Sequence, residues 1–176
     1  MKVIQIKPYD KLYNQLQEKR HDYVWHYFKL NKPRNFLEEE NKSVSLALLC
    51  KKNIIGSVML TPKNNRIIRF RMVFIIPLYQ KKGLGEKLIY EAEKKAKRMS
   101  FKEIRLISPE ENLPFYLKMG YSRNGDWWQN KKTNLKTIQL KKYIKHKILL
   151  DSLVKICHTI LGFKLKTRFR RRRTWK

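Results

Sequence analysis

A short glycine-containing turn, Gln80-Lys81-Lys82-Gly83-Leu84-Gly85, restricts the fold of this chain more than any other segment. It follows an apolar run from Ile67 to Ile76, closed by Pro77, whose composition predicts a buried central strand. It precedes a run from Glu86 to Arg98 whose apolar residues recur at the spacing of an amphipathic helix. The sequence therefore predicts a strand, a tight turn and a helix in direct succession.

A strand, turn and helix in this order can hold an anion. The first turn of a helix leaves backbone N–H groups unpaired and carries partial positive charge. Glycine allows the backbone to approach a phosphate closely, so such a turn can bind a pyrophosphate. The same pattern also fits a turn that needs glycine only for its positive φ angle. The turn by itself leaves both interpretations open.

A second segment adds to the first. Pro114-Phe-Tyr-Leu-Lys-Met-Gly-Tyr121 resembles the Phe-Tyr-x-Lys-x-Gly-Phe/Tyr segment of the GNAT superfamily of N-acetyltransferases. Gln80, Gly83 and Gly85 match the acetyl-CoA-binding signature of the same superfamily, which is Gln or Arg, two residues, Gly, one residue, then Gly or Ala. The two segments are separated by a predicted helix and strand, as in the family.

The resemblance implies acetyl-CoA as the cofactor. In the family, the strand before the turn separates from its neighbour and exposes backbone groups to pantetheine, while the turn holds the pyrophosphate. An asparagine ahead of the Phe-Tyr segment often contacts CoA; the asparagine of this sequence lies closer to the tyrosine than in those relatives. Carried over residue by residue, the cofactor-binding residues are Phe74, Ile75, Ile76, Gln80, Lys81, Lys82, Gly83, Leu84, Gly85, Glu86 and Asn112.

The implied reaction is acetyl transfer to an amine acceptor, which the sequence does not identify. The amine must be neutral to attack, and the departing thiolate needs a proton donor. Tyr116 matches the family tyrosine that protonates the thiolate; its alternative role is that of a core aromatic residue. The strand from Arg66 to Ile76 holds no acidic residue, so Glu110 and Glu111, after the next strand, are the nearest candidates for a general base, through water.

The order of predicted elements indicates the α+β class and, by the resemblance, the GNAT fold, with a mixed central sheet of about six to seven strands flanked by helices. The polar stretch 31–41 is expected to be a loop or short helix, and Glu38-Glu39-Glu40 within it a solvated acidic patch; the alternative is that these carboxylates attract a basic substrate. Strands are expected at 2–7, 44–50, 54–60, 66–76, 102–108 and 135–140, and helices within 9–30, 84–98 and 113–119.

We expect a GNAT-like domain over residues 1–143 and a basic extension over 144–176. The extension begins with an amphipathic pattern from 144 to 161 and continues as a basic tail interleaved with aromatic residues. Cations bind phosphates and aromatic rings stack on bases, so the tail is predicted to bind nucleic acid; an unstructured solubilising tail or a localisation signal is the alternative. The proposed contacts are Lys164, Lys166, Arg168, Arg170, Arg171, Arg172, Arg173 and Trp175.

The net charge of +28 also indicates an anionic partner, whether nucleic acid, an acidic protein or anionic lipid. Residues 144–176 hold 11 of the 42 Lys and Arg and one of the 14 acidic residues, so they carry +10 and leave +18 on residues 1–143. The favoured hypothesis is an N-acetyltransferase that docks on RNA or a ribosome. The alternative is a GNAT-fold protein recruited as a structural RNA-binding component of a ribosome, with little or no catalysis.

The cysteines, the lengths of the apolar runs and the histidines indicate the compartment and the absence of a metal site. Cys50 and Cys157 each lie in an apolar run, which predicts buried thiols in a reducing compartment. No apolar run reaches the ~18 residues of a membrane span. We therefore expect an intracellular protein of the cytoplasm or an organelle matrix. His21 and His26 lack nearby residues at metal-ligand spacing, so no metal site is expected.

Overall fold

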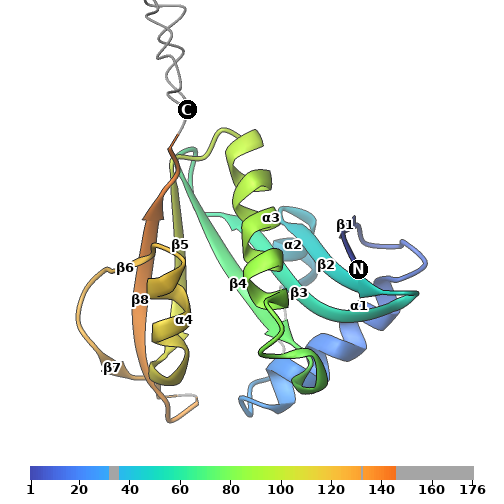
Figure 1. Ribbon diagram of the computed structural model, residues 1–176, viewed down its shortest axis with the longest axis horizontal. Coiled ribbons are helices and arrows are strands. Elements are labelled where there is room, and N and C mark those ends of the chain that lie inside the picture. Colours follow the sequence, from blue (N-terminus) through green and yellow to red (C-terminus); the bar gives the residue numbers. More distant parts are fainter. Residues whose placement is uncertain (32–35, 132, 146–176) are drawn as a thin grey trace, which may run out of the picture. The chain divides into compact units, whose positions relative to one another are not determined.

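A single mixed sheet forms the centre of the protein (Figure 1). The structure is a computed structural model that describes residues 1–31, 36–131 and 133–145. The strand order is β1-β2-β3-β4-β5-β8-β6, with β7 paired to β8. The α+β class is confirmed. The sheet has eight strands within the described ranges rather than the expected six to seven, because β6 and β7 are two-residue strands too short to give a sequence pattern.

The elements follow the predicted order. The strands are β1 (Lys2–Ile6), β2 (Val44–Cys50), β3 (Asn53–Pro62), β4 (Ile67–Ile75), β5 (Glu103–Pro109), β6 (Ser122–Arg123), β7 (Trp128–Gln129) and β8 (Lys136–Tyr143). The helices are α1 (Tyr13–Arg20), the π-helical η1 (His21–His26), α2 (Phe36–Asn41), the 3₁₀ turn η2 (Pro77–Tyr79), α3 (Leu84–Arg98), the 3₁₀ turn η3 (Glu110–Asn112) and α4 (Leu113–Lys118).

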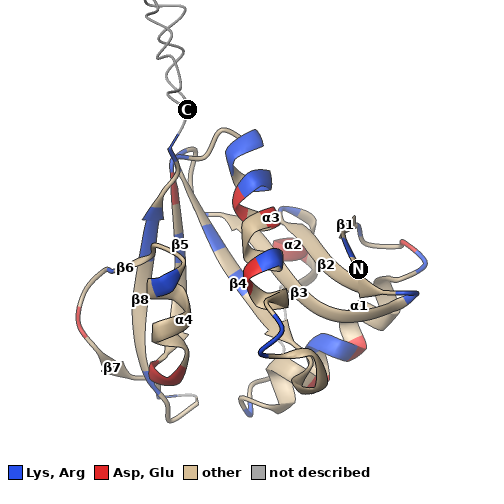
Figure 2. Ribbon diagram, in the orientation of Figure 1, with Lys and Arg blue, Asp and Glu red and all other residues tan. Residues whose placement is uncertain are grey.

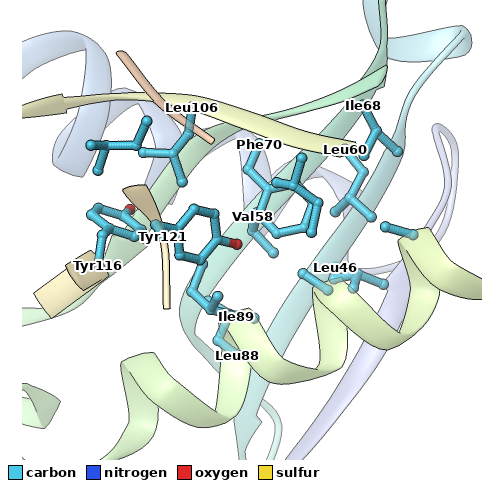
Figure 3. Packing of buried hydrophobic residues seen from close by; sticks show 14 of the residues in the cluster. Leu46, Val58, Leu60, Ile68, Phe70, Leu88, Ile89, Leu106, Tyr116 and Tyr121 are labelled. Carbon is cyan, nitrogen blue, oxygen red and sulfur yellow. The ribbon is translucent and has the colours of Figure 1, made fainter. Parts of the chain in front are cut away.

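The main core lies between one face of the sheet and helices α3 and α4. The apolar side of α3 packs on β2, β3 and β4, and Figure 3 shows Leu88 and Ile89 of this helix beside the strand residues Val58 and Phe70. Tyr116 of α4 belongs to the same core. The predicted apolar stripe of α3 is therefore confirmed, and the helix that follows the glycine turn is fixed against the sheet.

Helices α1 and α2 and the π-helical segment cover the opposite face, over β1 to β4. Leu16 of α1 packs against Ile6 and Leu49 of the first two strands. Trp25 and Phe36 meet edge to face, with ring centroids 5.5 Å apart, over Met59 of β3. Neither of these two smaller clusters contains a residue of β5 or β8.

A buried ion pair ties these helices to the sheet. The guanidinium of Arg20 binds Glu40 and donates a 2.8 Å bond to the Ser45 hydroxyl of β2. Glu40 also accepts hydrogen bonds from the Tyr13 hydroxyl (2.6 Å) and the Gln17 amide (2.9 and 3.0 Å). Desolvation, and after it the hydrogen bond to Glu40, raises the pKa of Tyr13. A buried carboxylate is tolerated only when its lone pairs are satisfied in this way.

The expected solvated patch at Glu38-Glu39-Glu40 is therefore wrong for two of its three residues. Glu40 is buried, and Glu39 makes a 2.6 Å ion pair with Arg71 of β4. Only Glu38 is exposed. The pattern misled because three consecutive residues of a short helix point in three directions, and one of these faces the sheet.

The described residues contain no helix that is both long and apolar enough to cross a membrane. The proposed nucleic-acid contacts Lys164, Lys166, Arg168, Arg170, Arg171, Arg172, Arg173 and Trp175 lie outside the described residues, as does Cys157.

Replacing Glu40 by Ala should lower the free energy of unfolding by about 3–5 kcal/mol, because it leaves the Arg20 charge buried without its carboxylate. Urea unfolding of the two proteins measures the difference. Glu38→Ala, on the exposed side of the same helix, is the matched control and should change stability by less than about 0.5 kcal/mol. Equal losses in the two variants would show that the buried pair does not hold α2 to the sheet.

Candidate active site

The pairing between β4 and β5 ends after three residues. Ile67, Ile68 and Arg69 pair in parallel with Glu103, Ile104 and Arg105, and no register continues beyond them. On its other side, β4 stays paired with β3 as far as Ile75. The second half of β4 therefore presents backbone groups to a gap on the β5 side, as the family resemblance implied.

A bulge in β4 accompanies this separation. The register against β3 shifts between Ser57 and Met59, opposite the segment from Arg71 to Phe74, and Met72 has φ +50°. The bulge places two consecutive side chains on the face covered by α1 and α2. Arg71 binds Glu39 there, and Met72 packs against the cluster of Trp25 and Phe36. Beyond the bulge, Phe74 stacks on Tyr23, with ring centroids 5.7 Å apart.

Ile75 is the residue at the end of β4 whose backbone faces the gap. Ile76 donates its N–H to Ile55 of β3 (2.9 Å). The carbonyl oxygen of Phe74 faces Gly56 of β3, since a Cβ built on that glycine would lie 2.9 Å from it. Because successive residues of a strand direct their polar groups to opposite edges, the groups of Ile75 point away from β3. Its carbonyl accepts a 2.8 Å bond from the Gln80 side chain, so Gln80 joins the end of the strand to the turn.

The turn after Gln80 presents unpaired N–H groups at the start of α3. Lys81 and Gly83 have φ angles of +56° and +73°, and Gly83 is the N-cap of the helix. The first helical bond runs from Lys87 N–H to the Gly83 carbonyl (3.1 Å). The N–H groups of Leu84, Gly85 and Glu86 therefore have no carbonyl one turn earlier to bind. A Cβ built on Gly83 would contact no protein atom, so this side of the turn is open.

Charged side chains surround this helix start. Lys81 and Lys82 are exposed, and Lys82 reaches back to the Leu78 carbonyl (3.0 Å). Glu86 makes a 2.8 Å ion pair with Lys118 of α4. This pairing partly neutralises the negative charge of the Glu86 carboxylate beside the helix start. A groove of about 460 Å³ begins at Gly83 and is lined further by Glu86, Lys87, Tyr90, Lys118 and Met119.

Gly85 is required for a different reason from Gly83. A Cβ at Gly85 would lie 3.3 Å from two ring atoms of Phe115 on α4, a contact closer than side chains ordinarily make. The absent side chain lets α4 approach the start of α3. This brings Tyr116, the next residue, into the same core as Ile75 and Leu84, which pack at its edge.

Tyr116 is buried at one end of the core (Figure 3). Its ring lies 5.0 Å from that of Phe115 and 5.6 Å from that of Tyr121, both in edge-to-face geometry. Burial raises the pKa of Tyr116, so the phenol keeps its proton at neutral pH. Among the described residues, its hydroxyl has no hydrogen-bond partner.

The other predicted residues lie on the surface. Glu110, Glu111 and Asn112 form η3, directly after β5, and all three are exposed. Glu110 makes a 2.7 Å ion pair with Lys136. Asn112 occupies the N-cap position of α4 without a side-chain capping bond. They lie at the end of β5 that borders the gap.

Sequence reasoning missed the bulge at Met72 and the contacts of Arg71 and Tyr23 beside it. One signal was available in the sequence: Gly56 lies inside a strand pattern, where a glycine often marks a bulge or a close backbone approach. The register of β2 against β3 does shift beside it, and a Cβ there would lie 2.4 Å from the Ile75 side chain.

Comparison with known proteins settles the family. Residues 11–142 match the model described as the acetyltransferase (GNAT) domain. The chain belongs to the GNAT family of acetyltransferases. Membership confirms the predicted class of enzyme, an acetyl-CoA-dependent N-acetyltransferase. No curated protein sequence matches the chain.

Solved structures share this fold at low sequence identity. An aminoglycoside 6'-N-acetyltransferase complexed with coenzyme A superposes with a TM-score of 0.69 at 14% identity, over 84% of this chain and 99% of the other. The aminoglycoside 6'-N-acetyltransferase of Enterococcus faecium gives 0.65 at 14%, over 84% and 99%. A GNAT acetyltransferase from Elizabethkingia anophelis with acetyl-CoA bound gives 0.62 at 14%, over 81% and 97%.

Replacing Gly83 by Val should reduce acetyl-CoA affinity at least about tenfold, or ~1.4 kcal/mol, because a branched side chain strains a positive φ and occupies the open side of the turn. Calorimetry measures the affinity. Gly125→Val is the matched control, since Gly125 also has a positive φ (+106°) and open surroundings, but it lies in the loop before β7. Unchanged affinity in a folded Gly83→Val protein would remove the turn from the cofactor site.

Proposed function

We propose that this GNAT enzyme binds acetyl-CoA along the gap between β4 and β5 and transfers the acetyl group to an amine. The observation that carries the proposal is the alignment of that gap with the open start of α3. A pantetheine chain needs backbone partners, and the Ile75 N–H that faces the gap can supply one, since the Ile75 carbonyl already accepts a bond from Gln80. A pyrophosphate needs N–H donors and positive charge, and the turn from Lys81 to Glu86 offers both.

The groove beside Gly83 is the proposed place for the nucleotide end of the cofactor. Tyr90 offers an exposed ring there, and Lys87 and Lys118 offer cations for a phosphate. Gln80 acts indirectly in this scheme, because its side chain is bound to Ile75 and holds the turn against the strand. Asn112 is exposed at the α4 N-cap and has no assigned contact to the cofactor.

The amine acceptor would enter on the face covered by α1 and α2, because the core fills the other face. There the Tyr23–Phe74 stack and the Glu39–Arg71 pair border the bulged part of β4. The neutral amine attacks the thioester carbonyl, and the C–S bond breaks as the acetyl group moves to nitrogen. The amine loses a proton, through water, to Glu110 or Glu111, of which Glu111 has no ion pair with a described residue.

Tyr116 is the proposed donor of the proton that the leaving thiolate accepts. Two observations support this role: burial raises the pKa of Tyr116 and keeps the phenol protonated, and Ile75 and Leu84 of the proposed cofactor-binding segments pack against the same core. A core aromatic role alone would leave the hydroxyl without function, so removal of that hydroxyl separates the two interpretations.

Tyr116→Phe should lower kcat by about 10²-fold or more while acetyl-CoA affinity changes little, because the ring and its packing remain. Steady-state kinetics on any amine that supports turnover, together with calorimetry, gives both quantities. Tyr121→Phe is the matched control, since it removes a second buried hydroxyl from the same aromatic cluster. Wild-type kcat in Tyr116→Phe, or equal losses in both variants, would return Tyr116 to a packing role.

We also propose that the enzyme docks on ribosomal RNA through the basic tail 163–176. The supporting observations are the tail's composition and the net charge of +28. The alternative is a structural ribosomal component without catalysis, and turnover distinguishes the two. A structural component would acetylate none of the amines offered, even if it bound acetyl-CoA tightly.

Deletion of residues 163–176 should weaken RNA binding and flatten its salt dependence, because each phosphate contact contributes roughly 0.7–0.9 to the log–log slope. Acetyl-CoA affinity of the same protein is the internal control and should not change. Equal RNA affinity and equal slope for the full-length and truncated proteins would contradict a binding role for the tail.

A further inference from the structure

The face of β5 and β8 that lies opposite α3 is uncovered by any described helix. Ile104 and Leu106 of β5 and Leu140 of β8 belong to the core under α3 and α4. Because side chains alternate along a strand, the residues between them point to the other face. Two large side chains on that face are open to solvent: Ile107 is 46% exposed and Tyr143 is 63% exposed. In register, Tyr143 is opposite Glu103 and Ile107 is opposite Gln139, so the two exposed side chains lie toward the two ends of this face.

A row of cations crosses this face. Arg69 of β4 is the register partner of Arg105 on β5, and Arg105 is the register partner of Lys141 on β8. Figure 2 shows Lys and Arg on each of these three strands. Like charges directly opposite one another destabilise a sheet. Negative charge from outside the row would therefore stabilise these two consecutive pairs of cations.

The described acidic residues compensate the row only in part. Arg105 makes a 2.5 Å ion pair with Glu103. Arg69 and Lys141 have no carboxylate within ion-pair distance among the described residues. Lys141 instead lies 5.8 Å from the centre of the Tyr143 ring. Burial and, after it, the neighbouring charge of Arg71 lower the pKa of Arg69, while the charge of Glu39 raises it in part.

The row is separate from the acetyl-CoA site. Arg69 lies six residues before Ile75 on the same strand, which corresponds to about 20 Å at ~3.3 Å per residue. Arg69 and Arg105 form the last register pair before the gap opens, and they take no part in the glycine turn or in the ring contacts of Tyr116. A ligand on the row therefore cannot be the cofactor already assigned to the other end of β4.

We propose that this surface, the basic sheet face formed by Arg69, Arg105, Ile107, Lys141 and Tyr143, binds an RNA segment with unpaired bases. Phosphates bind along the row and relieve its like-charge repulsion, while a base stacks at the exposed Tyr143 ring. The charge of +18 on residues 1–143 favours a polyanion over a second copy of this equally basic chain. This inference rests on the proposed RNA partner, but it does not depend on RNA binding by the tail.

The test compares two double variants of the full-length protein by fluorescence anisotropy with a labelled RNA hairpin that has a single-stranded loop. Arg69→Gln/Lys141→Gln removes the two cations without a carboxylate partner. Lys11→Gln/Lys52→Gln removes two exposed cations elsewhere and is the matched control for net charge. We expect at least an about tenfold greater loss of affinity in the first variant, and a log–log salt slope smaller by roughly 1.4–1.8, as two lost phosphate contacts require.

Tyr143→Ala should weaken binding of the hairpin loop without changing the salt slope, because stacking involves no counterion release. A thermal unfolding midpoint that falls in none of the variants, together with unchanged acetyl-CoA affinity, shows that the fold and the cofactor site are intact. Equal losses in the two double variants would overturn the proposal. A second result would also overturn it: light scattering shows a dimer that only Arg69→Gln/Lys141→Gln disrupts, while the RNA affinity of that variant is unaffected. The face would then be assigned to a second copy of the chain.

Because the tail is present in every variant, this comparison is independent of the deletion of 163–176. If RNA binding is lost when the tail is deleted but not when the row is neutralised, the tail is the RNA site. That result would overturn the proposal for the sheet face and leave the proposal for the tail intact.

Discussion

The early end of the pairing between β4 and β5 is the constraint on which the site depends. Two neighbouring parallel strands would normally continue their hydrogen bonds, and separating them exposes backbone groups that must find other partners. Here the sheet holds together because β3 remains bound to β4 and β8 remains bound to β5 along their lengths. The gap is therefore bordered by two rigid ladders, and a ligand that enters it completes hydrogen bonds that the sheet leaves open.

The glycines and the bulge make this separation compatible with a packed core. Gly56 lets the Ile75 side chain and the Phe74 carbonyl approach β3, and Gly85 lets Phe115 approach the start of α3. Met72, with its positive φ, turns the end of β4 so that Phe74 meets Tyr23. Each of these contacts fixes one border of the gap. The backbone donors at the helix start are thus held in place before any cofactor arrives, which lowers the entropy cost of binding.

Patterns local to the chain predicted most of the fold, and contacts between distant segments account for what they missed. The glycine turn, the amphipathic α3 and the hairpin of β2 and β3 each have a period or turn residue that is visible in sequence. Arg20 and Glu40 are separated by 20 residues, and each looks like an ordinary surface charge until the helices pack together. The positive φ of Met72 has no sequence signal, because a methionine adopts it only when the packing of Trp25 and Phe36 compensates. The role of Tyr116 came from the family resemblance, and its burial supports that role without testing it.

The distribution of charge along β4 connects the two proposed sites. Arg69, in its first half, joins the row across β5 and β8, and the pairing of β4 with β5 ends at this residue, so the gap begins directly after the row and continues past the bulge. Both lie on one strand, and Arg69 is separated from Ile75 by the length of six strand residues, about 20 Å. The Glu39–Arg71 pair lies between the two sites. Glu39 pairs with Arg71, whereas Arg69 has no carboxylate within ion-pair distance among the described residues, so the uncompensated positive charge of this strand lies at the row. On this view the positive charge of the sheet determines where a partner docks, and the gap determines which of the partner's amines reacts.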